Sequence, residues 1–319
     1  MLSSYDIKSF SQEVKKLRQS LGLTIDNVAA LTGISLSAIK ALEKGVAIPK
    51  FETLLILSNC YKVDLILVFN RHKDSKQIFT LYEKVNEHMT NGNKELIKHS
   101  LKDISLALLN EELNPVLIGD YLQLKYLFEG LEIVVNCIEE DSDCITKGLD
   151  KMIKALKVSI PGFKLDFYQG FKYSALEYRI LFSIASLLGI QKKCLLSNDI
   201  LASVLVFLNC YDYLEYCNSS LKAKAYALIS YNYHRLDEHE KVIQYADMGI
   251  SFCKGKDTTE YLPLLLARKS IALYNLEKSN WQVYYRQALS LLDIMGKEYL
   301  FKIYEEKFMH LVSLSNVPK

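Results

Sequence analysis

Two hydroxyl residues and two glycines give the most specific chemical signal in this sequence. Thr24 and Ser35 each precede a short stretch of helical periodicity. A hydroxyl at such a position accepts a hydrogen bond from a free backbone N–H group of the first helical turn. Gly33 follows the first stretch and Gly45 ends the second, and glycine adopts positive φ without a Cβ clash. The sequence therefore predicts two short helices joined by a tight turn.

Apolar residues at helical spacing must pack these helices against a common core. The predicted first helix, the predicted second helix, and a further helix that begins after Pro49 each carry such a set. The three sets are Ile25, Val28, Ala29 and Leu31; Ile39 and Leu42; and Phe51, Leu54, Leu55 and Leu57.

From Leu17 to about Phe69 the chain resembles the lambda-repressor-like (XRE) helix-turn-helix domains, which bind double-stranded DNA. An ordinary helical bundle with the same spacing is the alternative. One position departs from the family, which usually has Gln after the capping Thr to meet a phosphate; Ile25 stands here. The residues that carry the resemblance are Leu23-Thr24, Val28-Ala29, Leu31-Thr32-Gly33, Ile34-Ser35, Ile39, Leu42-Glu43, Gly45, Pro49 and Thr53-Leu54.

The resemblance implies that the helix from Ser35 to Lys44 enters the major groove of operator DNA. Leu36, Ser37 and Ala41 would face the bases, with Lys40 and Lys44 nearer the backbone. This helix has no Arg, Gln or Asn for bidentate base readout, so specificity would rest partly on DNA shape and half-site spacing. A degenerate domain that no longer binds DNA is the alternative. The full predicted DNA-contact set is Thr24, Ser35, Leu36, Ser37, Lys40, Ala41 and Lys44.

Charge is distributed unevenly along the 319 residues. Residues 1–73 hold ten Lys and Arg against six Asp and Glu, a net charge of +4, whereas the whole chain carries +2 and the remainder −2. A small basic head neutralises few phosphates, so we expect a homodimer to bind DNA where one head alone binds weakly. Half of the residues are apolar and only five are Pro, which indicates a second folded unit with a large core.

Several function classes find no support in the sequence. There is no glycine-rich phosphate loop, Gly-x-Ser-x-Gly motif or metal-spaced His/Cys cluster, so we expect no enzyme activity, no metal and no cofactor. No segment has the length and apolarity of a membrane span, and no secretory signal is recognisable, which favours a cytoplasmic protein. The seven cysteines, none in Cys-x-x-Cys, are expected to be reduced and to serve as small core residues.

Beyond a polar linker at 71–76, almost all of the chain has helical periodicity. Two successive helix pairs, 222–253 and 261–295, repeat with a period near 40 residues, with large residues at Tyr226 and Tyr233 and small ones at Ala246 and Gly249. Weaker copies fit 77–109, 121–156 and 174–208, and 298–314 is a candidate capping helix. These are degenerate tetratricopeptide-like repeats.

The predicted fold class is therefore all-α, with a lambda-repressor-like domain at 1–70 followed, at 77–319, by a right-handed α-solenoid of about five helix pairs. A non-repetitive helical domain is the alternative.

This order of domains resembles the RRNPP family of peptide-pheromone receptors, which includes the PlcR-like, PrgX-like and Rgg-like regulators. Residues 246–294, with Arg268-Lys269, look most like the PlcR-like branch. The resemblance implies a quorum-sensing transcriptional regulator in which a short imported peptide binds the concave face of the repeats. A protein-interaction regulator, a ligand-independent repressor and a phage-type lysis–lysogeny switch of the same design are alternatives.

A peptide main chain needs partners that both donate and accept hydrogen bonds, and the amide of Asn does both. By helix position, the first helix of each pair would line the groove, although an ordinary solvated helix face is an equally good interpretation of these positions. The predicted peptide-contact set is Arg179, Ser183, Lys224, Tyr231, Asn232, Tyr274 and Asn275.

Overall fold

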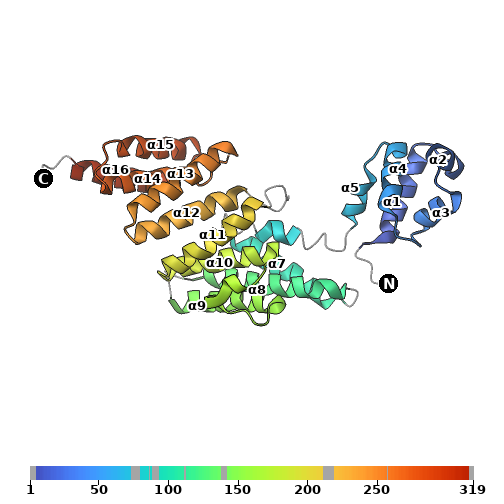
Figure 1. Cartoon of the computed structure of the whole chain (residues 1–319), viewed down its shortest axis with the longest axis horizontal. Helices are drawn as coiled ribbons and strands as arrows, with labels where there is room; N and C mark the ends of the chain where they lie inside the picture. The colour runs from blue at the N-terminus through green and yellow to red at the C-terminus, as the bar shows by residue number, and fades with distance from the viewer. Residues whose placement is uncertain are drawn as a thin grey trace. The chain divides into compact units, whose positions relative to one another are not determined.

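The computed structural model describes residues 5–72, 80–85, 87, 93–110, 113–137, 142–210, 219–256 and 258–315. It divides into two compact units, Met1–Leu81 with Ala107–Tyr121, and Tyr82–Leu106 with Leu122–Lys319. α-Helices and short 3₁₀ helices make up nearly all of the regular structure of the described residues (Figure 1), which confirms the predicted all-α fold class.

The first unit contains the predicted helix-turn-helix. Its helices are α1 (Ile7–Ser20), α2 (Ile25–Thr32), α3 (Leu36–Lys44), α4 (Phe51–Tyr61) and α5 (Leu65–Arg71). The apolar residues at helical spacing meet in one core, formed by Phe10, Val14, Val28, Ile39, Leu42, Leu54, Leu57, Tyr61, Leu65 and Val68.

The head extends slightly further than the sequence predicted. Arg71 is the last residue of α5, and the carbonyl of His72 accepts a hydrogen bond from the backbone N–H of Asp6 at 2.8 Å. The His72 ring also lies 2.7 Å from a carboxylate oxygen of Glu13. Residues 71 and 72 therefore belong to the head rather than to the linker, whose remaining predicted residues lie outside the described part of the chain.

One buried ion pair fixes α3 against α1. The guanidinium of Arg18 donates from Nε and Nη2 to the two carboxylate oxygens of Glu43, at 2.6 and 2.9 Å. Its Nη1 donates to the carbonyl of Leu23 at 2.7 Å. This bidentate geometry is the strongest form of a side-chain ion pair, and it raises the pKa of Arg18. The pair sets the rotation of α3 and thereby decides which of its residues face outward.

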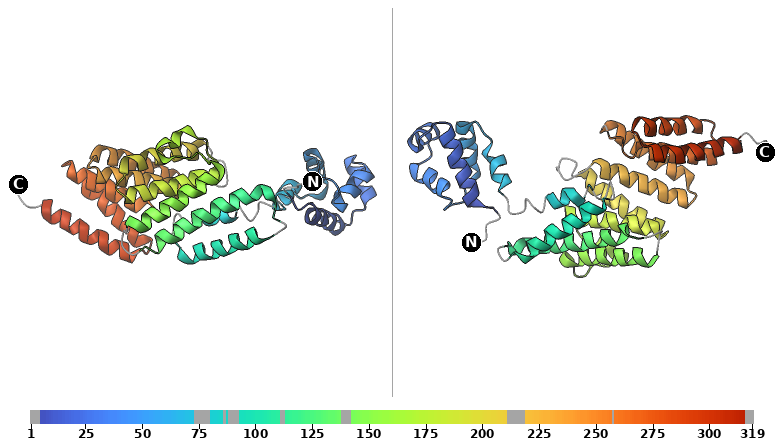
Figure 2. Two further views of the ribbon diagram at one scale, coloured as in Figure 1. Left: turned by 90° about the horizontal axis from the view of Figure 1, so that it is seen from below. Right: turned by 180° about the vertical axis from the view of Figure 1, so that it is seen from behind.

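The second unit is built from antiparallel helix pairs (Figures 1 and 2). α8 (Ile118–Val135), which begins at the border between the units, precedes α9 (Ser142–Ser159). Three further pairs follow, and α16 (Glu298–Ser315) ends the unit as the predicted cap. The pairs are α10 (Ala175–Ile190) with α11 (Cys194–Cys210), α12 (Ser219–Arg235) with α13 (His239–Gly255), and α14 (Leu262–Asn275) with α15 (Trp281–Ile294).

The predicted repeat is correct in period and nearly correct in boundaries. α7 (Lys94–Leu109) occupies the second half of the first predicted copy, whose first half lies largely outside the described residues. Gly249 shows why the pattern needs a small residue there. A Cβ on it would lie 2.8 Å from a methyl of Leu265 and 2.9 Å from the Cβ of Tyr226, so α13 could not pack against α12 and α14.

In the three pairs from α10 to α15, the corner within each pair is closed by one residue with positive φ. Lys192, Asp237 and Glu277 have φ of 64°, 56° and 56°, and Gly296 has 63° before α16. At each corner the N–H of the next residue bonds back across the helix end, as from Glu238 to the carbonyl of Tyr233 at 3.1 Å. This is the Schellman pattern of helix termination. Its recurrence shows that the pairs share one backbone design.

The first helices of successive pairs form one continuous layer. α10 contacts α12, and α12 contacts α14, whereas α11, α13 and α15 make no comparable contacts with one another over their described residues. In a curved stack of helix pairs, neighbours on the inner side lie closer together than neighbours on the outer side. α10, α12 and α14 are therefore the inner layer of the solenoid.

The segment between α9 and α10 was not predicted by the repeat pattern. It contains a short 3₁₀ helix, η2 (Leu165–Gly170), and buries the rings of Phe163 and Tyr168. Phe171 lies 5.8 Å from Phe163, centroid to centroid, and 6.1 Å from Phe167. This aromatic insertion lengthens the spacing between the second and third copies.

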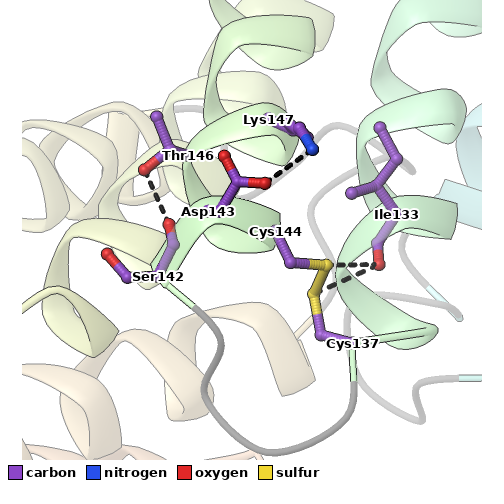
Figure 3. Close-up of a disulfide and its surroundings, with 7 residues drawn as sticks. All are labelled: Ile133, Cys137, Ser142, Asp143, Cys144, Thr146 and Lys147. Atoms are coloured by element: carbon purple, nitrogen blue, oxygen red, sulfur yellow. Dashed lines mark hydrogen bonds and ion pairs between the residues drawn. A yellow bond between two sulfur atoms is a disulfide. The ribbon is translucent and has the colours of Figure 1, made fainter.

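Four of the seven cysteines fall into two groups. Cys194 and Cys253 are buried core residues, as predicted. Cys137 and Cys144 form a disulfide bond between the end of α8 and the start of α9, with Cα atoms 6.1 Å apart (Figure 3), so the prediction that all cysteines are reduced is wrong for this pair. The sequence pattern did not show it because their separation of seven residues fits no redox or metal motif.

Breaking the Arg18–Glu43 pair should loosen the head. Arg18→Met leaves the carboxylate of Glu43 buried without its partner, which costs roughly 3 kcal/mol. Amide hydrogens of α1 and α3 should then exchange about a hundredfold faster in hydrogen-exchange measurements on the full chain. Arg71→Met, which removes an exposed arginine of the same unit, is the control. Equal exchange rates in the two variants would contradict this role for the pair.

Candidate functional site

Both predicted helix caps are present in the head. The hydroxyl oxygen of Thr24 accepts from the backbone N–H of Asn27 at 3.0 Å, and that of Ser35 accepts from the N–H of Ala38 at 3.2 Å. Gly33 and Gly45 end α2 and α3 with φ of 71° and 67°. These contacts satisfy N–H groups that the first helical turn leaves free, and they fix the turn that positions α3.

The outer face of α3 carries the predicted DNA-contact residues. Leu36, Ser37, Lys40 and Lys44 are exposed, and Ala41 is half-buried. Ile39 and Leu42 on the opposite face are buried in the head core. The helix therefore presents an apolar residue, a hydroxyl and two ammonium groups on one surface, a set able to contact thymine methyls, base edges and phosphates.

Three of the residues predicted to contact a peptide are instead buried. Arg179 is 2% exposed and Ser183 5% exposed, and both donate to backbone carbonyls of their own helix. Asn232 is 1% exposed, and its amide nitrogen donates to Ser197 and Asn198 on α11 at 2.9 and 2.8 Å. Arg179 and Ser183 therefore bond within α10, whereas Asn232 joins α12 to α11.

The remaining predicted contacts differ from one another. The ring of Tyr231 is exposed on α12, and Lys224 lies two turns earlier on the same face, half-buried. Asn275 is exposed at the end of α14. Tyr274 instead packs edge-on against Trp281 of α15, with ring centroids 5.2 Å apart. Lys224, Tyr231 and Asn275 stay candidates for ligand contact.

Two arginines that the sequence analysis did not select extend this surface. The guanidinium carbon of Arg268 lies 4.6 Å, and that of Arg235 5.6 Å, from the centroid of the Tyr231 ring. Arg235 donates from Nη1 to the carbonyl of Gly189 on α10 at 2.7 Å, and Arg268 donates from Nη1 to the carbonyl of Ala227 on α12. A signal was present in the sequence, since the helices at 219–235 and 262–275 contain no acidic residue.

Other kinds of site are not seen in the described residues. No group of three or more His, Cys, Asp and Glu side chains there is placed to hold a metal ion. Within the same residues, none of the helices combines the length and apolarity needed to cross a membrane.

Comparison with known proteins supports both halves of the architecture. Residues 14–68 match the helix-turn-helix family. No curated protein matches the chain in sequence. The fold is similar to Bacillus thuringiensis PlcR in complex with the peptide PapR7 and DNA, at 17% identity over 94% of this chain and 99% of that chain, with a TM-score of 0.63.

Two further solved structures are similar over nearly their whole length. ComR from S. thermophilus, in complex with DNA and its signalling peptide ComS, is 12% identical, with 95% and 99% of the chains covered and a TM-score of 0.56. A putative transcriptional regulator from Listeria monocytogenes EGD-e is 13% identical, with 98% and 100% covered and a TM-score of 0.55. At these identities the likeness establishes the fold.

Asn232 should behave as a structural residue. Asn232→Ala removes both hydrogen bonds to α11 and leaves buried polar groups unpaired, which should lower the free energy of unfolding of the repeat unit by about 1–3 kcal/mol in denaturant titrations. Asn275→Ala, at an exposed helix end, should change it by less than about 0.5 kcal/mol. Unchanged stability of the Asn232 variant would contradict the assignment.

Lys224 should make stability depend on pH. Burial lowers its pKa to about 8 from 10.5, with Glu260 opposing the shift. At a pH between these two pKa values, the Lys224 amine is protonated in the unfolded chain and neutral in the folded chain. The free energy of unfolding should therefore rise with pH, by at most about 3 kcal/mol. Denaturant titrations from pH 8 to pH 10 should show this rise in the wild type and lose it in Lys224→Met. Parallel curves for the two proteins would contradict it.

Proposed function

We propose that this protein is a cytoplasmic transcriptional regulator that binds operator DNA as a homodimer and is controlled by a short peptide held on the inner layer of its repeat unit. The observation that carries the proposal is the combination, in one chain, of an outward-facing recognition helix with a curved helical-repeat unit. The fold similarity to PlcR, whose structure contains both a peptide and DNA, supports the same combination of ligands here.

The head supports the DNA-binding part of the proposal. Its core and the Arg18–Glu43 pair occupy the inner faces of α1 and α3, which leaves Lys40 and Lys44 free of ion pairs with the described residues. Their ammonium groups lie one helical turn apart on α3, a spacing suited to the edge of a major groove. The lack of Arg, Gln and Asn on this surface favours recognition of DNA shape together with half-site spacing.

The repeat unit supports the ligand-binding part. Its inner layer presents the ring of Tyr231, which is 39% exposed, beside the half-buried Arg235 and Arg268. An extended peptide that lies across α12 and α14 would meet these groups in succession.

A head that reads few base edges gains affinity from a second copy, and a dimer requires half-sites separated by about one helical turn of DNA or a multiple of it.

Lys40 gives the direct test of DNA binding. Operators are first selected from random double-stranded DNA with the full chain, and their affinity is then measured at several salt concentrations. Lys40→Ala should weaken binding by about 1–3 kcal/mol if its ammonium group meets a base, or reduce the salt slope by about one unit if it meets a phosphate. Lys15→Ala, an exposed lysine on α1, is the control. Failure to select any DNA sequence would overturn the proposal and favour a protein-interaction role for the repeats.

A further inference from the structure

Two helices of the inner layer, α12 and α14, carry positive charge without acidic residues of their own, whereas α10 contains Glu177. α12 and α14 contain neither Asp nor Glu, whereas their partners α13 and α15 contain Glu240, Asp247 and Asp293. The basic residues of the two inner helices are Lys222, Lys224, Arg235, Arg268 and Lys269.

Three of these charges are accounted for by neighbouring helices or side chains. Lys269 forms an ion pair with Asp247 of α13 at 2.5 Å. Lys222 is buried with its ammonium group 5.6 Å from the ring centroid of Phe252, also on α13. Lys224 is influenced by the charge of Glu260. The two arginines beside Tyr231 are different, because neither forms an ion pair with a carboxylate of the described residues.

Arg268 has the least compensated charge of the two. Its described partners are all neutral: Nη1 donates to the carbonyl of Ala227 and lies 3.3 Å from the hydroxyl of Ser230, and the guanidinium lies over the ring of Tyr231. Nη2 and Nε donate to no group of the described residues. Burial lowers the pKa of Arg268 to about 10, which reflects the cost of holding a cation there without an anion.

An open pocket of about 770 Å³ lies beside this arginine. Leu264, one turn before Arg268 on α14, lines it, and so does Tyr304 of α16, which interacts electrostatically with Arg268. Its other lining residues are the apolar Pro263, Leu292, Met295 and Leu300, together with Tyr261, Glu260 and Lys297. The guanidinium of Arg268 is not itself in the pocket wall, but it lies next to two residues that are, Leu264 and Tyr304, and much of that wall suits an apolar side chain.

We propose that Arg268 binds a carboxylate of the regulatory peptide, while the adjacent pocket receives a bulky apolar side chain of the same peptide. This inference rests on the proposed function and specifies its ligand as an anionic peptide. Arg is suited to the role because Nη2 and Nε can donate to both oxygens of one carboxylate. Partial burial strengthens the attraction, and the Tyr231 ring holds the guanidinium in place.

Affinity selection on the full chain tests this. Two synthetic random heptapeptide mixtures are used, one with a free C-terminal carboxylate and one with a C-terminal amide, and bound peptides are identified by mass spectrometry. Peptides retained by the wild type should be enriched in an acidic residue beside a bulky apolar residue, or should come only from the free-carboxylate mixture. The first result assigns the carboxylate to a side chain, and the second assigns it to the C-terminus.

Variants then place the carboxylate at Arg268. The best retained peptide should bind Arg268→Met at least tenfold more weakly, and Arg268→Lys should recover part of the loss. A peptide analogue without the carboxylate, made by Asp→Asn or Glu→Gln substitution or by amidation, should bind wild type and Arg268→Met equally. Arg286→Met, which removes an exposed arginine from α15, should bind the original peptide as the wild type does.

The outcomes separate this inference from the proposed function. Retention of no heptapeptide from either mixture would overturn both. Retention of neutral or basic peptides, with no preference for a carboxylate, would overturn the role of Arg268 and leave peptide control supported. If Arg268→Met fails to fold, as seen by circular dichroism, the comparison of each peptide with its uncharged analogue on the wild type decides, since equal binding of the two overturns the inference.

Discussion

The direct contact between the first helices of successive pairs is the constraint on which the repeat unit depends. Arg235 of α12 donates to a carbonyl of α10, and Arg268 of α14 donates to a carbonyl of α12, so the same type of bond joins each inner helix to the one before it. These contacts hold the inner helices closer together than the outer ones and curve the stack. The same two arginines then present their charge beside Tyr231, so the groups that shape the inner layer also give it its chemistry.

A comparable constraint operates in the head. The bidentate bond from Arg18 to Glu43 fixes the rotation of α3 about its axis. The burial of Ile39 and Leu42 in the head core requires the same rotation. Because these neighbours are packed inward, the side chains of Lys40 and Lys44 are exposed to solvent. Both proposed ligand surfaces thus follow from buried arginine contacts, one paired with a carboxylate and the other with neutral groups only.

Sequence patterns predicted the helix-turn-helix because caps and glycines act locally: Thr24, Ser35, Gly33 and Gly45 lie where the structure needs them. The helix pairs could be predicted because the spacing of apolar residues marks the buried face of each helix, and the small residue Gly249 marks where two helices approach closely. The corners between the helices of a pair carry no glycine at the position of positive φ. Lys192, Asp237 and Glu277 adopt that conformation there. Which of the candidate groove residues are exposed could not be predicted, because periodicity shows that a helix has a polar face but does not show whether that face meets solvent or another helix. Asn232, for example, meets α11.

We propose that this chain couples a peptide on the repeat unit to DNA on the head. Coupling between two ligands is a free energy, usually of about 1–3 kcal/mol, and it is reciprocal. The most direct measurement is therefore operator affinity of the full chain with and without a saturating peptide obtained by affinity selection. Coupling of this size changes operator affinity by about 5- to 150-fold, with an equal change in peptide affinity when operator is added. Identical operator affinity in the presence and absence of saturating peptide would contradict it.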